Sequence, residues 1–245
     1  MRLYLFDLGW LDLDRRVIMP AAPSGQRLLI PVPAYLIDAG EGGLVLVDTG
    51  MSRAVLAGDH QFAGVMRPVE TQGAFVTDRL AALGIEPARV THVVATHFHF
   101  DHAGGLGEFG HATIVAQRAA VEAARAGSAA ERAAVERPGL RWQLVDGDTD
   151  LLPGVGLLET SGHAPGHQSV LVRLTSGRAF LLAIDAIYNR DQLAADDWGA
   201  YRDPAAARAS ARKVQELAAE TGATLVYGHD AEQWRSLRHA PDFYE

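Results

Sequence analysis

The stretch Thr96-His97-Phe98-His99-Phe100-Asp101-His102 decides how this sequence is interpreted. It places three imidazoles and one carboxylate in one short segment, directly after the apolar run 93–95. Four such groups cannot all face one way on a strand or helix, so we expect a strand to end here and the chain to turn. His97 and His99 would point one way and Asp101 and His102 another, which favours two adjacent metal ions. Nitrogen ligands mixed with a carboxylate leave positions open for water, which is typical of catalytic rather than structural sites.

Two closely spaced divalent ions need more ligands than this segment can give, so the others should come from elsewhere in the chain. Each further candidate lies just past the end of a predicted strand, where α/β architectures gather functional groups. These candidates are His163 and His167 after the run 155–160, Asp185 after the run 180–184, and His229 after the run 224–228.

Hydrophobic periodicity predicts two strand-rich halves with a helical region between them. The predicted strands are Leu3–Leu8, Ala34–Asp38, Leu44–Asp48, Val90–Ala95, Ala112–Ala116, Val155–Thr160, Ser169–Leu174, Ala179–Ile184 and Thr224–Tyr227. The predicted helices, each followed by a glycine as is common just past helix ends, are Thr71–Leu83, Gln117–Ala126 and Pro204–Thr221. The Ala-rich stretch 119–134, with its alternating Glu and Arg, predicts a solvated helical hairpin. This pattern predicts an α/β protein with two packed sheets and helices outside.

The composition excludes several classes of protein. A chain of 245 residues that is 48% hydrophobic can bury a sizeable core, and we predict one undivided domain, 1–245. The formal net charge of −8 argues against a nucleic-acid surface, whose usual footprint is a basic patch. Because the sequence has no cysteine, it forms no disulfides and offers no thiolate ligands. The first apolar run is cut by Asp7, and no apolar stretch reaches the length of a membrane span. We therefore expect neither a secretory signal nor a membrane span, and predict a cytoplasmic location.

The order of these motifs resembles the metallo-β-lactamase superfamily. The resemblance rests on THFHFDH, then GHAPGH at 162–167, the Asp of AIDAIY, the His of VYGHD and the turn LVLVDTG at 44–50. Within the superfamily the chain is most similar to the N-acyl-homoserine lactone lactonases, the quorum-quenching enzymes. That similarity extends to the segments 30–33, 101–105, 165–169, 185–188 and 228–230 and covers nearly the whole chain. It implies an αββα sandwich with two metal ions at one edge of the sheets.

The resemblance also implies which residue binds which ion. His97, His99 and His163 would hold the first ion, Asp101, His102 and His229 the second, and Asp185 would bridge them. Two adjacent dications need an anionic bridge, and one carboxylate can span the distance between them. Zinc is the expected metal, with iron, cobalt or manganese as alternatives.

Other histidines are expected to have smaller roles. His167 could replace His163 as a ligand because both lie in one turn, but we expect it to pack behind the ligands or to orient them. The other histidines lie in no such turn and are expected to be surface or partly buried residues without a role in the site: His60, His92, His111 and His239. Asp48 is expected to orient a ligand without touching metal.

The implied chemistry is hydrolysis of a carbonyl compound. A bound metal lowers the pKa of water to near 7, so that a bridging hydroxide can attack the lactone carbonyl. The resemblance places Tyr188 where the family keeps a tyrosine that supports the developing oxyanion; packing is its alternative role. Asp101 is a ligand that could also pass the proton to the leaving alkoxide.

The substrate prediction is an N-acyl-homoserine lactone, a small molecule, with no nucleic-acid or membrane partner; a homodimer is compatible with the sequence. An acyl chain needs an apolar groove, for which Met19–Pro20, Phe62–Met66 and Trp198–Tyr201 are candidates. The alternatives are a glyoxalase II-like thioester hydrolase, a broad lactonase or esterase, a phosphodiesterase or β-lactamase, and a non-catalytic metal-binding protein. The absence of cysteine disfavours the β-lactamase, since the best-known zinc β-lactamases have a Cys where this chain has Asp185.

Overall fold

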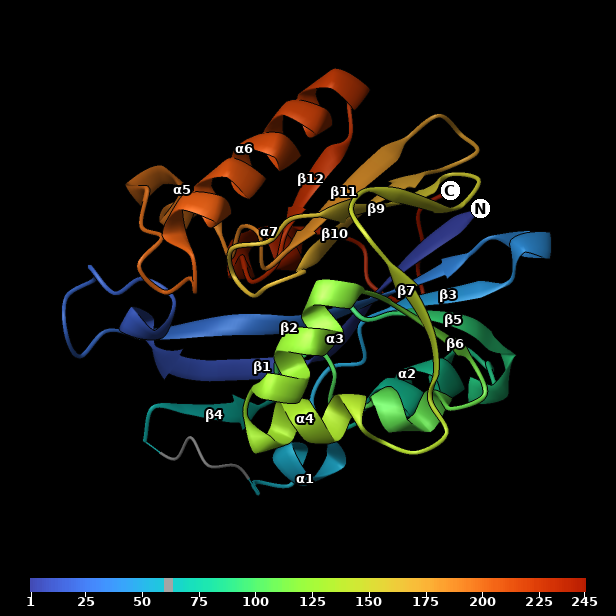
Figure 1. Cartoon of the computed structure of the whole chain (residues 1–245), viewed down its shortest axis with the longest axis horizontal. Coiled ribbons are helices and arrows are strands. Elements are labelled where there is room, and N and C mark those ends of the chain that lie inside the picture. Colours follow the sequence, from blue (N-terminus) through green and yellow to red (C-terminus); the bar gives the residue numbers. More distant parts are fainter. Residues whose placement is uncertain (60–63) are drawn as a thin grey trace.

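The computed structural model describes residues 1–59 and 64–245, and it has four layers in the order helix, sheet, sheet, helix (Figure 1). Its strands are β1 (Arg2–Asp14), β2 (Arg27–Asp38), β3 (Leu44–Val47), β4 (Met66–Val69), β5 (Val90–Val94), β6 (Thr113–Gln117), β7 (Arg141–Val145), β8 (Thr149–Leu152), β9 (Val155–Glu159), β10 (Gln168–Arg173), β11 (Ala179–Ile184) and β12 (Thr224–Tyr227). Its α-helices are α1 (Arg53–Leu56), α2 (Val76–Ala82), α3 (Arg118–Ala126), α4 (Ala129–Val135), α5 (Arg190–Ala195), α6 (Pro204–Thr221) and α7 (Ala231–Ser236).

Within the described residues, one sheet has seven strands in the order β4-β1-β2-β3-β5-β6-β7 and the other has five in the order β12-β11-β10-β9-β8. Strands β3, β5, β6 and β7 pair in parallel, as do β11 and β12, whereas the other pairings are antiparallel. Helices α2 and α3 contact the first sheet and α6 contacts the second. This is the αββα sandwich that the sequence predicts.

Successive side chains along each strand face opposite sides of its sheet, and both sides are buried. Tyr35 and Ile37 of β2 share one buried cluster with Phe180 and Leu182 of β11, which fills the space between the sheets. Leu36, between Tyr35 and Ile37, belongs to a second buried cluster that includes residues of α2, α3 and α6. The strands therefore have hydrophobic residues on both faces, as their nearly continuous apolar sequences require.

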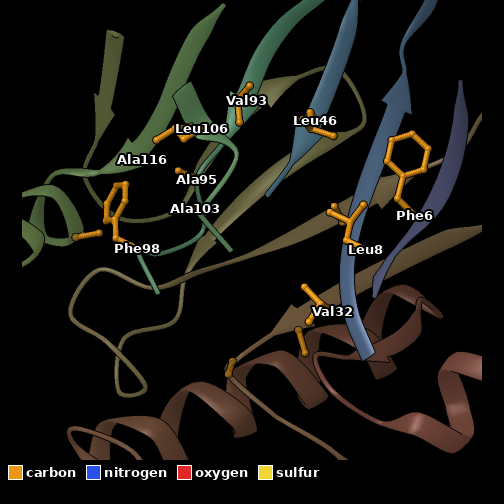
Figure 2. Packing of buried hydrophobic residues seen from close by; sticks show 14 of the residues in the cluster. Phe6, Leu8, Val32, Leu46, Val93, Ala95, Phe98, Ala103, Leu106 and Ala116 are labelled. Atoms are coloured by element: carbon orange, nitrogen blue, oxygen red, sulfur yellow. The ribbon is translucent and has the colours of Figure 1, made fainter. Parts of the chain in front are cut away.

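The second cluster also anchors the histidine-rich segment. Figure 2 shows Leu46 and Val93 projecting from their strands into the cluster that also contains Ala95, Phe98 and Ala103, which lie around the predicted ligands in the sequence. Phe98 and Ala103 are buried. The segment is thus fixed by apolar side chains interleaved with its polar ones.

Helix boundaries follow capping chemistry. The carboxylate of Asp203 accepts two backbone N–H groups at the start of α6, and Gly222 ends that helix at φ 65. Ser128 and Glu131 form a capping box at the start of α4, so the predicted helical hairpin is observed as α3 and α4. Gly127 between them is extended, with φ −83, and its place at the helix end does not depend on a left-handed conformation.

Some boundaries differ from the sequence prediction. Helix α2 begins at Val76 rather than Thr71, because the preceding segment turns at Gly73, which has φ 63. Gln117 ends β6, and α3 starts one residue later. Strands β4, β7 and β8 and the short helices α1, α5 and α7 are not predicted by the sequence. No helix in the described part of the chain is both long and apolar enough to cross a membrane.

Candidate metal centre

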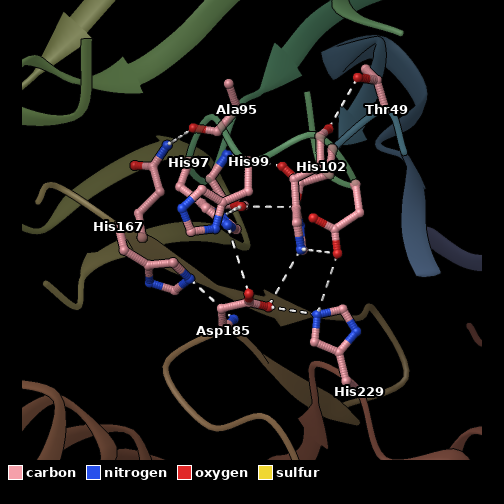
Figure 3. Close-up of polar contacts among 12 residues, drawn as sticks. Thr49, Ala95, His97, His99, His102, His167, Asp185 and His229 are labelled. Carbon is pink, nitrogen blue, oxygen red and sulfur yellow. Dashed lines mark hydrogen bonds and ion pairs between the residues drawn. The ribbon is translucent and has the colours of Figure 1, made fainter. Parts of the chain in front are cut away.

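The seven predicted ligands come from chain segments that follow β5, β9, β11 and β12. These strands end at Val94, Glu159, Ile184 and Tyr227, and the ligand-bearing residues come next in the sequence in each case. Because the strand ends meet at one edge of the sandwich, side chains far apart in the sequence converge there, as Figure 3 shows.

The structure brings all seven predicted ligands together in two groups. Within each group the ligand atoms all lie within 4.8 Å of one another. The first group contains His97, His99, His163 and Asp185; the second contains Asp101, His102 and His229. Apart from Asp185, which the sequence analysis expects between the two ions, the groups have the same members as the two expected ligand sets. Whether each residue binds metal stays a prediction that only metal-bound protein can test.

Asp185 lies between the two groups, and its two oxygens face different histidines. Oδ2 is 3.2 Å from Nε2 of His163 and 3.7 Å from Nε2 of His97. Oδ1 is 3.1 Å from Nε2 of His229 and 3.4 Å from Nε2 of His102. This is the placement that a bridging carboxylate needs.

The unsatisfied atoms at the centre fit metal ions. Nε2 of His102 and Oδ1 of Asp185 are buried, and neither has a hydrogen-bond partner among the described residues. Elsewhere in the site, Nε2 of His163 lies 3.1 Å from Nε2 of His97 and 2.8 Å from Nδ1 of His99. Lone pairs that converge so closely repel one another unless a cation or a proton lies between them, so the residues present fit divalent cations.

The opposite ring nitrogens are held by partners outside the centre, which is the usual way that metal-binding histidines are oriented. Nδ1 of His102 lies 2.8 Å from Oδ2 of Asp48, and Nδ1 of His229 lies 2.8 Å from the carbonyl of Pro31. Asp48 in turn accepts hydrogen bonds from the backbone N–H and the hydroxyl of Thr96. The role expected of Asp48 from the sequence is thus matched by its contacts. The Pro31 carbonyl carries no side-chain signal, so sequence reasoning missed it.

The electrostatic environment differs between the two groups. Burial lowers the pKa of His97 and of His163 well below the usual value of histidine, which leaves both rings neutral and able to bind metal. Burial also acts on His102, but the carboxylates of Asp185 and Asp101 outweigh it and raise the pKa of His102 to about 10. The carboxylates of Asp101 and Asp185 therefore favour a positive charge at the second group, which a divalent cation would supply.

Tyr188 is buried beside the first group. Its hydroxyl lies 2.9 Å from Nδ1 of His163, and its ring meets that imidazole edge-on with centroids 5.4 Å apart. Tyr201 packs against Tyr188, with ring centroids 4.8 Å apart, and its hydroxyl has no hydrogen-bond partner among the described residues.

None of the remaining histidines that the structure describes belongs to the two groups of ligand atoms. His167 is fully buried, but its Nε2 accepts the backbone N–H of Asp185 at 3.1 Å, and burial lowers its pKa to about 4. It therefore supports the centre from behind. His92 and His111 contact Thr91 and the Pro87 carbonyl respectively. The ring of His239 packs against that of the nearby Trp234. His60 lies outside the described residues.

A cavity of about 350 Å³ opens onto the centre. Six of the seven predicted ligands line it, all except His102, together with Tyr188. The other lining residues are mainly apolar: Leu11, Leu13, Val17, Ile18, Ile30, Met66, Phe98, Phe100, Ala120, Ala123, Ala124, Ala164, Pro165, Ala200 and Tyr201. Of the groove residues predicted from the sequence, Met66, Ala200 and Tyr201 line this cavity. Met19 and Trp198 are buried in the hydrophobic core instead, and Phe62 lies outside the described residues.

Gly104 and Gly105 follow the ligand segment, and close packing explains them. A Cβ at Gly104 would lie 2.2 Å from the backbone nitrogen of Ser52, and one at Gly105 would lie 2.8 Å from the carbonyl oxygen of Thr49. The chain turns at both residues, but neither has a positive φ, so a left-handed conformation is not what requires glycine here. The glycines instead let two loops approach closely.

Comparison with known proteins identifies relatives over the whole chain. The model of the Metallo-beta-lactamase superfamily matches residues 28–229. An N-acyl homoserine lactonase of Bacillus thuringiensis is 33% identical over 247 residues, which cover 99% of this chain and 98% of that protein. The N-acyl homoserine lactonase AttM of Azorhizobium caulinodans is 36% identical over 266 residues, covering 100% and 99%. The solved structure of an N-acyl homoserine lactone hydrolase, with the product N-hexanoyl-L-homoserine bound at the catalytic metal centre, matches with a TM-score of 0.91 and 32% identity, over 99% of this chain and 98% of that one.

Proposed function

Because the chain belongs to the metallo-beta-lactamase superfamily and, within it, to the N-acyl homoserine lactonases, we propose that it is a metal-dependent hydrolase that opens the lactone ring of N-acyl homoserine lactones. The observation that carries this proposal is the position of Asp185 between two histidine groups on the floor of an apolar cavity. The reaction adds water across the ring ester. It releases an N-acyl homoserine, in which the carbonyl has become a carboxylate and the ring oxygen a hydroxyl.

The proposed metal ligands divide into the two observed groups. His97, His99 and His163 would hold one ion, Asp101, His102 and His229 the other, and Asp185 would contact both. When bound, the two ions would supply hydroxide at neutral pH and polarise the lactone carbonyl.

Tyr188 is proposed to donate a hydrogen bond to the carbonyl oxygen as negative charge develops there. If His163 binds metal through Nε2, its Nδ1 must carry the ring hydrogen, and this N–H donates a hydrogen bond to the Tyr188 oxygen. The phenolic hydrogen is then free for another acceptor. Because Tyr188 lines the cavity, the lactone carbonyl is an available acceptor.

Asp101 is proposed to pass a proton to the ring oxygen as it leaves. Its carboxylate lines the cavity, and Oδ2 lies 3.7 Å from Nε2 of His102 and 3.8 Å from Nε2 of His229. It is therefore beside the centre and accessible to substrate, as a proton carrier must be.

The apolar wall of the cavity is proposed to bind the acyl chain. Strands β1 and β2 and helix α3 contribute six of the fifteen apolar residues of this wall, and loops and short elements contribute the rest. Glu131 and Arg202 are the charged side chains that line the cavity in addition to the proposed ligands. An apolar chain bound there would be removed from water, while the lactone head group would lie over the centre.

The test is a panel of substrates given to the metal-loaded protein, with Asp185→Asn as the inactive control. We expect kcat/KM for N-acyl homoserine lactones to exceed that for S-lactoylglutathione and simple esters by a large factor. Rapid turnover of the thioester with the lactones untouched would instead identify a glyoxalase II-like hydrolase. A protein that binds metal but hydrolyses no member of the panel would fit a non-catalytic role.

Finer statements are part of the same proposal. We propose zinc as the native metal because nitrogen and carboxylate ligands with open positions suit it, with iron, cobalt and manganese as alternatives to be decided by elemental analysis. The single domain spanning 1–245, the cytoplasmic location, the absence of a nucleic-acid partner and any homodimer stay predictions from the sequence.

A further inference from the structure

The backbone that leads into Asp185 has an unusual conformation. Ile184, the residue before it, has φ 52, in the left-handed region that β-branched residues strongly avoid. The N–H of Ala186 bonds to the carbonyl of Ala183 at 3.1 Å, so Ile184 occupies the first central position of a tight turn. Positive φ at that position normally calls for Gly, Asn or Asp. The pairing of β11 with β12 shifts register at the same place, between Leu182 and Ile184.

A chain of buried polar groups connects the two sides of this turn. On one side, the hydroxyl of Ser169 donates to the carbonyl of Ala183 at 2.9 Å. On the other, the N–H of Asp185 donates to Nε2 of His167 at 3.1 Å. Between them, Thr160 lies 2.9 Å from Nδ1 of His167 and 3.0 Å from the Ser169 hydroxyl. All three side chains are completely buried.

The packing opposite this chain also fits the turn. The carbonyl of Ile184 points at Gly228, where a Cβ would lie 2.4 Å from its oxygen. Any other residue at position 228 would push the turn out of place. Gly228 directly precedes His229, so the same backbone approach sets the position of a second predicted ligand.

We propose that His167 is a positioning residue for the metal centre. His167 accepts the N–H of Asp185 and is connected through Thr160 and Ser169 to the carbonyl of Ala183. These contacts hold the left-handed turn at Ile184, and the turn directs the Asp185 carboxylate between the two histidine groups. This inference rests on the proposed metal site, but it does not depend on which substrate is hydrolysed.

The decisive variants are His167→Leu and His167→Gln. Leucine fills similar space but accepts no hydrogen bond, whereas the amide oxygen of glutamine can reach the position of Nε2. The matched control is His239→Leu, which changes a half-buried histidine that stacks on Trp234 away from the centre. Metal affinity is measured by competition with a chelator, and the thermal midpoint of each metal-free variant is measured separately.

We expect His167→Leu to weaken both ions by about 10- to 100-fold, the usual cost of losing a partner that orients a ligand. His167→Gln should keep most of the affinity, and His239→Leu all of it. Wild-type affinity in His167→Leu would overturn the proposal, as would loss of one ion only, since that result would make His167 a ligand. Equal loss of thermal stability in the Leu and Gln variants, with metal affinity unchanged in both, would assign His167 to packing and overturn it too.

A second experiment remains decisive if His167→Leu does not fold. Ile184→Gly and Ile184→Ala remove almost the same side chain, but only glycine adopts the left-handed turn freely. Combined with Thr160→Val, which breaks the link between His167 and Ser169, Ile184→Gly should bind both ions more tightly than Ile184→Ala does. Equal affinities would show that the turn needs no support. Because no lactone is used, failure of the proposed lactonase activity would leave these results unaffected.

Discussion

The phenolic oxygen of Tyr188 lies 2.9 Å from Nδ1 of His163, so the proposed oxyanion donor and a proposed metal ligand are in direct contact. Replacing Tyr188 by Phe removes the hydroxyl but keeps the ring that packs on Tyr201. We expect kcat to fall by about 10- to 1000-fold, as on deleting one oxyanion donor, with metal content unchanged. Steady-state kinetics with elemental analysis measures both quantities.

Tyr201→Phe is the matched control, because it removes a hydroxyl from the same cavity that makes no hydrogen bond in the described structure. Its kcat should change much less. If Tyr188→Phe keeps the wild-type kcat, the hydroxyl serves only to orient His163 or to pack.

The two groups of ligands predict a specific pattern of metal loss. Purified protein should carry about two ions per chain, since seven side chains converge on two positions. His163→Ala should weaken the ion of the first group and His229→Ala that of the second. Asp185→Ala should weaken both, because its two oxygens face different groups. Active wild-type protein with a single ion would refute the dinuclear site.

Asp48 offers a test of the outer contacts. Asp48→Asn keeps a side chain that tolerates the left-handed backbone there, where φ is 60, but it removes the negative charge beside His102. We expect the second ion to bind about 10- to 100-fold more weakly, as measured by chelator competition. Asp38→Asn, at the end of β2, is the control and should bind both ions normally. Unchanged affinity in Asp48→Asn would show that the carboxylate is dispensable.

The apolar wall predicts how the rate depends on acyl-chain length. Each methylene of the chain that becomes buried should contribute up to about 0.8 kcal/mol to binding. Ala123 of α3 lines the cavity, so Ala123→Phe should lower kcat/KM for long-chain lactones much more than for short-chain ones. Ala126→Phe, on the exposed end of the same helix, should preserve the wild-type profile. Equal effects of Ala123→Phe on all chain lengths would place the acyl chain elsewhere.

The central strands and the convergence of the seven candidate ligand side chains could be predicted from the sequence because their signals are local and strong. Buried strands such as β11 are continuous apolar runs, and Asp185 and His229 stand directly at strand ends. The strands that the sequence did not predict, β4, β7 and β8, all lie at sheet edges. An edge strand buries fewer side chains, and in β7 only Val145 is fully buried. Strand β4 contains Pro68, which argues against a strand by propensity alone.

Apart from Asp48, the partners that orient the candidate ligands could not be predicted, because they have no distinctive sequence pattern. The acceptor for His229 is a backbone carbonyl at Pro31, almost two hundred positions away in the chain. The contact between Thr160 and Ser169 depends on the pairing of β9 with β10, and the left-handed turn at Ile184 contradicts the preference of isoleucine. Tertiary packing determines both this contact and this turn, and the neighbouring residues in the sequence give no signal for either.

The most direct test of lactone hydrolysis is to identify the product formed from N-hexanoyl homoserine lactone by mass spectrometry, with metal-loaded and metal-stripped protein compared. Lactone hydrolysis predicts a single product heavier than the substrate by one water, formed only with metal and returned to the lactone by acid. Hexanoic acid with free homoserine lactone, which acid cannot recombine, would contradict it by revealing amide cleavage. Unchanged lactone after incubation with fully metal-loaded protein would contradict it equally.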